Sequence, residues 1–261
     1  MIRRDFLIGL SLAATAEGES LSQADSRAFD EYISPIEASL PQSSFWSDES
    51  PSRLADLKAG LIPLGPLVHP NPKDVGDSYI HDWVAAVQIK GAKAAQLVAV
   101  LQDFDRHKIY YQPDVVNSLF LGKNGDVFRS SMRTHKKKIM TVDLDYEYET
   151  RFFAQAPTRG YSVVHSVKIS EVRNAGDKNE TVLPPGTGHG FLWRMNSYWR
   201  WDERPDGLLA ELRSISLTRD VPAAIAWMIS GIITGMPRES LQFTLGRTRQ
   251  AVLSQPAPKP A

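Results

Sequence analysis

Cysteine is missing from this sequence of 261 residues. Its absence excludes disulfide bonds, thiolate metal ligands and a cysteine nucleophile, so the fold has to rest on its hydrophobic core. An excess of either charge is missing too, because 30 basic residues balance 30 acidic residues. A chain without a net charge has little electrostatic attraction for a polyanion, and we expect no nucleic acid among its partners.

Complete catalytic and metal-binding motifs are also missing. The six histidines show neither His-x-x-x-His nor His-Glu-x-x-His spacing. No Gly-x-Ser-x-Gly elbow and no phosphate-binding glycine loop occur. The sequence therefore assigns no catalytic residue, no metal ligand and no cofactor, and it favours a binding function over an enzymatic one.

The first residues have the layout of an export signal. Arg3 and Arg4 precede a short apolar run that starts at Phe6, and small residues follow as far as Ala16. This order resembles a twin-arginine signal peptide, and the run is too short to span a bilayer as a helix. We expect residues 1–16 to be removed and the mature protein to be periplasmic or otherwise extracytoplasmic. A frayed N-terminal helix is the alternative.

Residues 17–79 are interpreted as an N-terminal arm that packs on the main domain. Apolar residues follow helical spacing between positions 22 and 40, but Pro35 interrupts the pattern. Serine and proline are frequent in the remainder of the arm, which predicts turns and extended connections. At the other end, residues 254–261 are rich in proline and predict a disordered tail.

The main domain, residues 80–253, contains one strand, one amphipathic helix over residues 92–104, a succession of strands and a closing helical segment. The Asn124-Gly125 pair predicts a tight hairpin. This order predicts an α+β fold in which a curved antiparallel sheet wraps around a long C-terminal helix and encloses a space. Strands are predicted at 80–90, 115–121, 127–135, 139–153, 161–172, 191–201 and 208–218.

The closing segment is predicted to consist of two helices. Residues 222–236 are apolar and uncharged, residues 238–253 form a more polar amphipathic pattern, and Pro237 stands between them. The apolar part is shorter than a membrane span, so the mature chain is expected to have no transmembrane segment. This part is interpreted as buried core or as a cover over a cavity; transient contact with a membrane surface is the alternative.

Several segments of the main domain resemble the START-like superfamily, the SRPBCC group of polyketide cyclases, dehydrases and lipid-transport proteins. The resemblance rests on the order of the elements, on the strand that contains Trp83, and on segments 189–200, 216–220 and 237–241. It implies a helix-grip fold with a cavity between the sheet and the last helix. In that superfamily the cavity usually holds a hydrophobic or amphipathic molecule.

Aromatic residues share strand faces in a pattern that is compatible with such a cavity. The predicted inward faces hold His81 and Trp83; Tyr146 and Tyr148; Tyr161, Val163, His165, Val167 and Ile169; and Phe191, Trp193, Met195, Ser197, Trp199 and Trp201. The alternative is that these side chains fill a dry core. The predicted ligand contacts are Trp83, Tyr146, Tyr148, His165, Trp193, Met195, Trp199 and Arg213.

Two of these residues bear on possible chemistry. His165 stands among apolar neighbours and is interpreted as a hydrogen-bonded structural histidine, a ligand contact or a general acid/base. Arg213 shares a strand face with Glu211, and this pair lies either at the sheet surface or inside the cavity. Inside a cavity, the forked guanidinium of Arg213 would grip a carboxylate or phosphate.

Four acidic residues share one face of a single strand: Asp143, Asp145, Glu147 and Glu149. Like charges in a ladder need water, cations or arginines beside them. A three-residue loop at 136–138 would place Arg129 opposite Asp145. We expect a solvated, charge-compensated outer surface, and a divalent-metal site is the alternative.

Three functional hypotheses follow. The leading one is an exported START-like protein that binds a hydrophobic or amphipathic small molecule mainly through aromatic walls. The second is a cyclase- or aromatase-type enzyme in which a histidine or arginine assists proton movement on a hydrophobic substrate. The third is a protein-interaction module whose core is filled by its own side chains.

Overall fold

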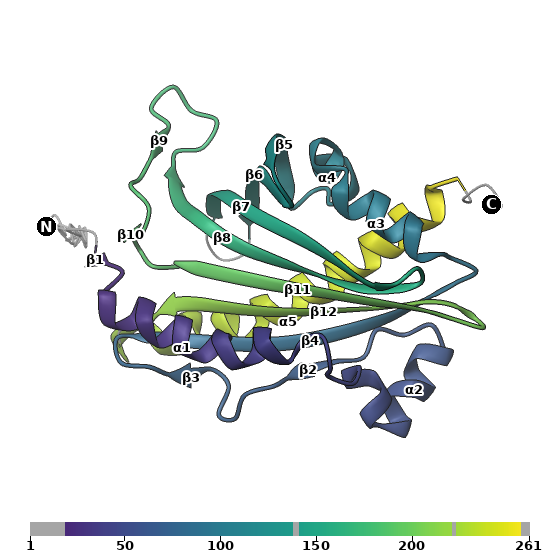
Figure 1. Ribbon diagram of the computed structural model, residues 1–261. Coiled ribbons are helices and arrows are strands. Elements are labelled where there is room, and N and C mark those ends of the chain that lie inside the picture. Colours follow the sequence, from purple (N-terminus) through teal and green to yellow (C-terminus); the bar gives the residue numbers. More distant parts are fainter. Residues whose placement is uncertain (1–18, 138–140, 221–222, 257–261) are drawn as a thin grey trace, which may run out of the picture.

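The computed structural model describes residues 19–137, 141–220 and 223–256, and for residues 223–236 it describes the backbone alone. Ten of the described strands form one antiparallel sheet with the order β2-β4-β12-β11-β8-β7-β6-β5, and β3 and β9 attach to β4 and β8 (Figure 1). These strands are β2 (Leu64–Pro66), β3 (Lys73–Asp74), β4 (Ser78–Lys90), β5 (Val115–Asn124), β6 (Val127–Lys137), β7 (Thr141–Ala156), β8 (Arg159–Arg173), β9 (Thr181–Val182), β11 (Arg194–Arg204) and β12 (Gly207–Arg219).

Two long helices lie on opposite sides of this sheet (Figure 1). The described helices are α1 (Gln23–Ser39), η1 (Trp46–Glu49), α2 (Pro51–Lys58), α3 (Ala94–Gln102), η2 (Phe104–Arg106), α4 (His107–Tyr110) and α5 (Ala223–Ser254), and the short strands β1 (Glu19–Ser20) and β10 (Thr187–Gly188) pair with each other. We call the face toward α5 the inner face and the face toward α1 the outer face. The expected α+β class, with a curved antiparallel sheet and a long C-terminal helix, is confirmed.

The first strand of the main domain follows its predicted alternation. His81, Trp83 and Ala85 of β4 stand opposite Ser216, Ser214 and Leu212 of β12, and cross-strand partners point to the same face of a sheet. Ala85 packs in the core with Leu241 and Leu245 of α5. The odd-numbered residues of β4 therefore form part of the inner face, as predicted.

The hairpin between β5 and β6 is also as predicted. Asn124 stands opposite Val127, so two residues form the turn. Gly125 has a φ of +55°, a left-handed conformation that glycine adopts at little cost. The Asn-Gly pair thus predicts a tight connection, but the two turn residues are Gly125 and Asp126 rather than Asn124 and Gly125.

Both predicted helix interruptions are wrong. Pro35 lies inside α1, and Pro237 lies inside a single helix that runs from Ala223 to Ser254. Proline has a fixed φ near the helical value and removes one hydrogen bond of the ladder. Packing of the helix on the sheet offsets that loss: Phe29 and Ile33 of α1 are buried on the outer face, and Leu245 of α5 is buried on the inner face.

The N-terminal arm packs along the outer face. Phe29 and Ile33 of α1 pack against Tyr198, Ile215 and Leu217 of the sheet. Farther along the arm, Phe45 and Leu57 pack against Ala86 and Leu209, and β2 and β3 extend the sheet beside β4. The arm is therefore integrated into the core of the domain. The boundary at residue 79 and the signal peptide stay predictions.

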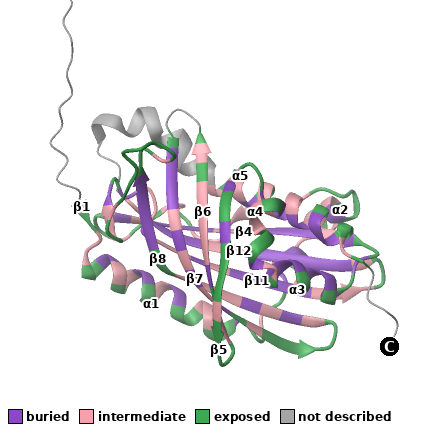
Figure 2. Cartoon of the chain, turned by 90° about the horizontal axis from the view of Figure 1, so that it is seen from above, coloured by how far each residue is buried: buried purple, intermediate pink, exposed green. Residues whose placement is uncertain are grey.

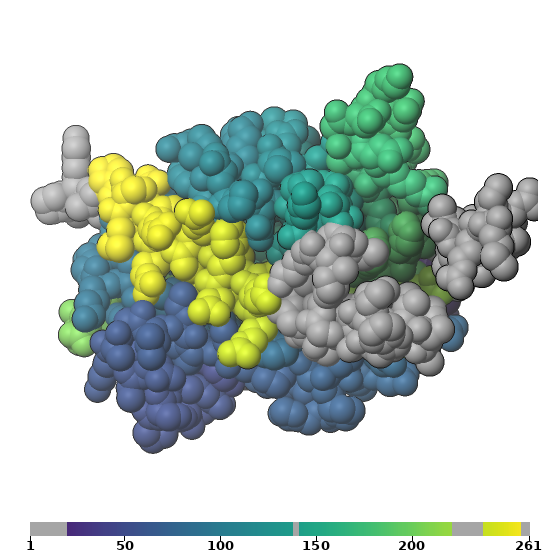
Figure 3. Space-filling model, turned by 180° about the vertical axis from the view of Figure 1, so that it is seen from behind, coloured from purple at the N-terminus to yellow at the C-terminus, as the bar shows by residue number. Residues whose placement is uncertain are grey.

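The second half of α5 closes one end of the inner face. Leu241, Leu245, Ala251 and Val252 pack into the largest core cluster together with α3. From behind, this half of α5 lies between the α3–α4 region above it and the α2 region below it (Figure 3). The inner face is thus sealed at this end by two helices.

Candidate functional site

The inner face consists of a closed half and an open half. In the closed half, Val87, Ile89, Leu208 and Ala210 have no exposed surface and belong to the core beneath α3 and α5. Figure 2 shows this buried region on the central strands β4, β12 and β11. The open half consists of the inner-face residues His81, Trp83, Met132, Tyr146, Tyr148, Val164, Met195, Ser197, Ser214 and Ser216, several of which remain partly exposed.

The cross-strand register brings small polar residues together in the open half. Ser214 stands opposite Trp83 on one side and Ser197 on the other, and Ser216 stands opposite His81 and Met195. Short serine side chains stand at the centre of this half, whereas Leu208, Ala210 and Leu212 of the closed half pack in the core with residues of α3 and of the second half of α5. Trp83, Met195, Ser197 and Ser214 are accordingly only partly buried.

Two polar ring atoms in the open half have no hydrogen-bond partner among the described residues. The Nε2 atom of His81 lies 3.0 Å from Thr218 Oγ1, but its Nδ1 atom is unpaired, as is the indole Nε1 of Trp83 on the same strand face. Buried polar atoms in folded proteins are nearly always paired with protein or with bound molecules. These two atoms therefore mark a position where a polar atom of a ligand would be stabilised.

Two stacked tyrosines lie on the same sheet face, on β7, which β12, β11 and β8 separate from β4. The rings of Tyr146 and Tyr148 are stacked with centroids 5.3 Å apart, and both side chains belong to a cluster with Val164, Ile169 and Met195. Burial raises the pKa of Tyr146 to about 12 and that of Tyr148 well above its usual value. Both hydroxyl groups consequently stay protonated and uncharged at neutral pH.

The predicted ligand contacts separate into three groups. Tyr146, Tyr148 and Met195 pack in one cluster of the open half, and Trp83 lies on the same sheet face but packs against the core cluster of β4 and α5. Trp199 also points to the inner face, but it is buried in the closed half with Trp201. Trp193 precedes β11 and is buried; its ring lies against Gly190, where an added Cβ would come 3.0 Å from the ring atoms. His165 and Arg213 are on the opposite side of the sheet.

The expected position of His165 on the inner face is wrong because β8 contains an irregularity. Lys168 stands opposite Glu147 but Ser166 stands opposite Tyr148, so Val167 has no cross-strand partner, and it is 50% exposed. One extra residue in a strand reverses the faces of all residues beyond it. Ile169 keeps its predicted inward direction, whereas Tyr161, Val163 and His165 point to the outer face.

On the outer face, His165 is part of a hydrogen-bonded contact with the arm. Its Nε2 atom lies 2.6 Å from Glu37 Oε1, and the buried Tyr198 hydroxyl donates to the same oxygen at 2.7 Å. Burial raises the pKa of Glu37, but the hydrogen bonds from His165 and Tyr198 outweigh burial and lower it overall. The structural interpretation of His165 is therefore the one that the geometry supports.

Arg213 also lies beneath the arm. Its guanidinium donates from Nε to Asp82 Oδ1 at 2.9 Å and from Nη2 to Asp82 Oδ2, and the Tyr32 hydroxyl of α1 donates to Asp82 at 2.8 Å. Its strand neighbour Glu211 lies 3.5 Å from Arg200. Both charged pairs are on the outer face, so Arg213 does not reach a ligand on the inner face.

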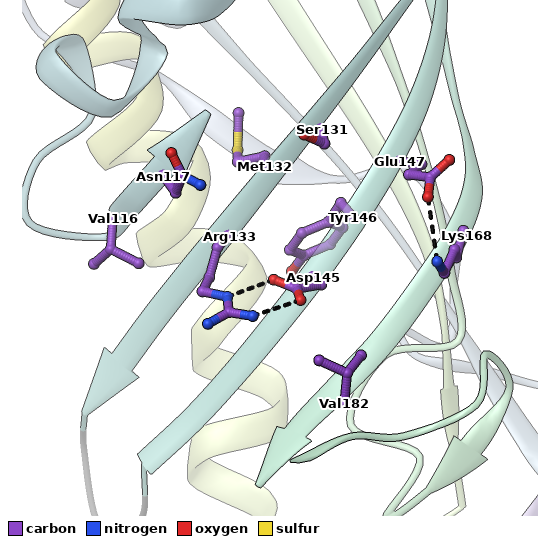
Figure 4. Close-up of a pocket in the computed structure, with 10 residues that line it drawn as sticks. All are labelled: Val116, Asn117, Ser131, Met132, Arg133, Asp145, Tyr146, Glu147, Lys168 and Val182. Carbon is purple, nitrogen blue, oxygen red and sulfur yellow. Dashed lines mark hydrogen bonds and ion pairs between the residues drawn. The ribbon is translucent and has the colours of Figure 1, made fainter. Parts of the chain in front are cut away.

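The acidic ladder is compensated by basic residues, as expected, but in a different register. Arg133 stands opposite Asp145, and Arg129 stands opposite Glu149. Arg133 binds Asp145 through two hydrogen bonds of 2.6 and 2.7 Å, and Lys168 contacts Glu147 at 3.2 Å. These residues line a depression of about 540 Å³ on the outer face (Figure 4).

No metal site accompanies this ladder in the described part of the chain. No group of three or more His, Cys, Asp or Glu side chains there is suited to hold an ion. The outer depression is instead a solvated surface whose charges neutralise one another: in Figure 4, dashed lines join Arg133 to Asp145 and Glu147 to Lys168.

A second depression, of about 580 Å³, lies at the end of β7 and β8. Two histidines line it and each is paired with a buried carboxylate: His135 Nδ1 lies 2.6 Å from Asp143, and His189 Nδ1 lies 2.9 Å from Glu171. Glu171 also accepts the backbone N–H groups of His189 and Phe191. These contacts fix the connection before β11 to the sheet, and we assign them a structural role.

The histidine and the serines of the open half are not among the ligand contacts that the sequence predicts. Alternation places His81 on the inner face, but it singles out neither His81 nor Ser197, Ser214 and Ser216 as site residues. The signal that could have found them is the run of serines at alternate positions of the last strands. Their convergence with Trp83 depends on the pairing of β4, β12 and β11, which only the fold provides.

Among the helices that the structure describes, none combines the length and the hydropathy needed to cross a membrane. No protein-family model matches the sequence, and no curated protein is significantly similar to it. Solved structures, however, are similar in three dimensions. The STAR-related lipid transfer protein of Xanthomonas axonopodis has a TM-score of 0.44 and 18% identity, and the match covers 74% of this chain and 99% of that one.

Two further structures show the range of these neighbours. Human STARD10 matches with a TM-score of 0.44 and 9% identity over 91% of this chain and 83% of its own. The Zhui aromatase/cyclase from a Streptomyces strain matches with a TM-score of 0.42 and 10% identity over 69% of this chain and 99% of its own.

The sheet order and the long C-terminal helix on its inner face decide the fold. The chain has a helix-grip fold. At such low identities the neighbours are similar in fold alone and do not identify a ligand or a reaction.

The buried imidazole of His81 gives a testable pH dependence. Burial lowers its pKa from 6.5 to about 4, so the folded protein favours the neutral ring while the unfolded chain binds a proton. Stability contributed by this residue is therefore complete above about pH 6.5 and is lost as the pH falls toward 4, by about 3 kcal/mol. Urea unfolding at pH 7, 5 and 4 should show this loss in the wild type.

The control is His81→Gln, which removes the titrating group at similar size. We expect the difference in unfolding free energy between the wild type and this variant to shrink steadily between pH 6.5 and 4. A difference that stays constant with pH would show that His81 titrates normally and contradict its burial as a neutral residue.

Proposed function

We propose that this protein binds an amphipathic small molecule at the open half of the inner face. The observation that carries the proposal is the pair of unpaired buried atoms, His81 Nδ1 and Trp83 Nε1, on the sheet face that also holds the stacked rings of Tyr146 and Tyr148. An unsatisfied buried polar group costs about 1–3 kcal/mol. A polar ligand atom at this position would remove that cost.

The rest of the ligand would contact apolar surface. Tyr146, Tyr148, Met195 and Val164 form one hydrophobic cluster on this face, and Met195 and Val164 are still partly exposed. Apolar area removed from water contributes about 25 cal/mol per Å² before the costs of ordering. Binding by burial therefore needs no covalent chemistry and no cofactor, and a carrier function fits this site better than catalysis.

We also propose that the protein acts outside the cytoplasm. Support comes from the paired arginines, the short apolar run and the small residues that end at Ala16. These residues lie outside the described part of the structure. Sequencing the N-terminus of the protein from an exported fraction would test the proposal, and a retained Met1 would contradict it.

Native mass spectrometry tests the binding function directly. The mature protein is purified from its own exported fraction, weighed intact, and weighed again after organic extraction. We expect a reproducible added mass that extraction removes and that reveals the chemical class of the ligand. A mass without addition, together with no uptake of Nile red, would overturn the proposal and favour an interaction module with a filled core.

A further inference from the structure

We propose that the ligand is electrically neutral and presents a hydrogen-bond-accepting oxygen, such as a carbonyl, ester or hydroxyl oxygen, to Trp83 on the face that it shares with His81. The inference rests on the proposed function and specifies its ligand class. It distinguishes neutral amphipaths from anionic ones, such as free fatty acids and acidic phospholipids, which are equally hydrophobic.

The first observation is the absence of charged side chains from the described open half. Its polar groups are hydroxyl, indole and phenol groups and one imidazole. Burial lowers the pKa of His81 to about 4, so this imidazole is neutral at pH 7. Among the described residues of this part of the face, no cation is therefore available to balance a buried carboxylate or phosphate, and no anion is available to balance an amine.

The second observation concerns the charged residues at the margins of the inner face. Lys136 lies 3.2 Å from Asp114 and also donates to Ser240. Glu171 shares its face with Leu144 and is held by His189 at 2.9 Å. Both charges are already engaged by protein partners, so recruiting either one for a ligand would break an existing pair.

The third observation comes from the sequence of the helix that follows β12. Residues 223–236, which open α5, contain no aspartate, glutamate, lysine or arginine. This stretch therefore contains no residue that could supply a counter-charge. A charged ligand group without a partner in a dry site is strongly disfavoured and neutralises or stays in water.

The donor inventory defines the ligand's polar atom. An indole Nε1 only donates, and Trp83 Nε1 has no acceptor in the described part of the protein. The buried hydroxyls of Tyr146 and Tyr148 are also protonated donors at neutral pH. A single acceptor oxygen on the ligand would satisfy Trp83, whereas an ammonium group would leave this donor unpaired.

A matched pair of ligands tests the inference. Methyl dodecanoate and dodecanoate share a chain and a carbonyl group and differ in charge. Each is titrated at pH 7, below its aggregation concentration, against the mature protein loaded with the neutral dye Nile red. We expect the ester to displace the dye at a concentration at least about tenfold lower than the acid, because only the acid has to desolvate a charge.

A charge variant provides the second readout. Ser214→Lys places an ammonium group beside Trp83 in the open half and is expected to reverse the preference in favour of dodecanoate. Ser131→Lys places the same group on the outer face, in the depression of Figure 4, and should leave the preference unchanged. Thermal unfolding of both variants verifies that each is folded.

The outcomes separate this inference from the proposed function. Dye binding with equal or better displacement by dodecanoate would overturn neutral-ligand selectivity and leave the binding function intact. Dye binding that neither compound displaces would also count against the inference, because the neutral ester is expected to compete. Absence of Nile red binding, together with an unmodified native mass, would overturn the proposed function itself.

Discussion

Replacing Asp82 by asparagine is expected to lower the free energy of unfolding by about 3 kcal/mol, at the lower end of the range for a broken buried ion pair. Asp82 is fully buried and accepts hydrogen bonds from Arg213 and Tyr32. The substitution keeps the shape of the side chain but removes its charge. Arg213, whose side chain is 23% exposed, would then lack its counter-charge beneath the arm.

The matched control is Asp145→Asn. Asp145 also forms two hydrogen bonds with one arginine, Arg133, but this pair lies on the solvated outer surface. We expect the control to cost about 1 kcal/mol or less, because exposed ion pairs contribute little. Urea unfolding at pH 7 measures both variants. Equal losses for the two would show that the arm is not held to the sheet by a buried charge.

Replacing Ser214 by phenylalanine is expected to weaken ligand binding by at least about tenfold. The added ring would block the ligand both from the apolar surface of the inner face and from its hydrogen bond to the Trp83 indole. Ser214 stands between Trp83 and Ser197, and it is one of the short side chains of the open half. A phenylalanine ring at this position occupies the space beside the unpaired indole. Nile red titration and native mass spectrometry measure the loss.

A control on the other side of the sheet separates occlusion from destabilisation. Ser131→Phe adds the same ring to the outer depression and is expected to leave the affinity for Nile red unchanged. Overpacking costs about 1–3 kcal/mol where space is short, so thermal unfolding is recorded for both variants. Should Ser214→Phe fail to fold, Ser197→Leu serves as the smaller block. Undiminished binding by a folded inner-face variant would exclude the open half as the site.

The integration of the arm has a consequence for engineering the protein. Asp82 and Glu211 form charged contacts on the sheet beneath it, Glu37 of the arm itself binds His165, and burial raises the pKa of Glu211 to about 7. Removing the arm would expose these groups together with the apolar residues around Tyr198. Variants for ligand studies should therefore retain the arm in full.

The sequence determined the elements of this protein and, for most strands, their faces. Alternation placed His81 and Trp83 inward on β4, and the Asn-Gly pair placed the first hairpin. These features depend on residues close to one another in the chain, and backbone geometry restricts such residues to few arrangements. Local sequence patterns therefore sufficed to predict the α+β class.

Three features follow only from the tertiary structure. They are the residues of β8 that face inward, the continuation of α1 and α5 through proline, and the packing of helices on both faces of the sheet. The unpaired Val167 changes the face of His165, and nothing in the local alternation signals an extra residue. Burial of α1 and α5 on the sheet outweighs the cost of Pro35 and Pro237. The pairing of distant strands brings Ser197, Ser214 and Trp83 together, because a binding site requires contacts between segments whose separation in sequence carries no local signal.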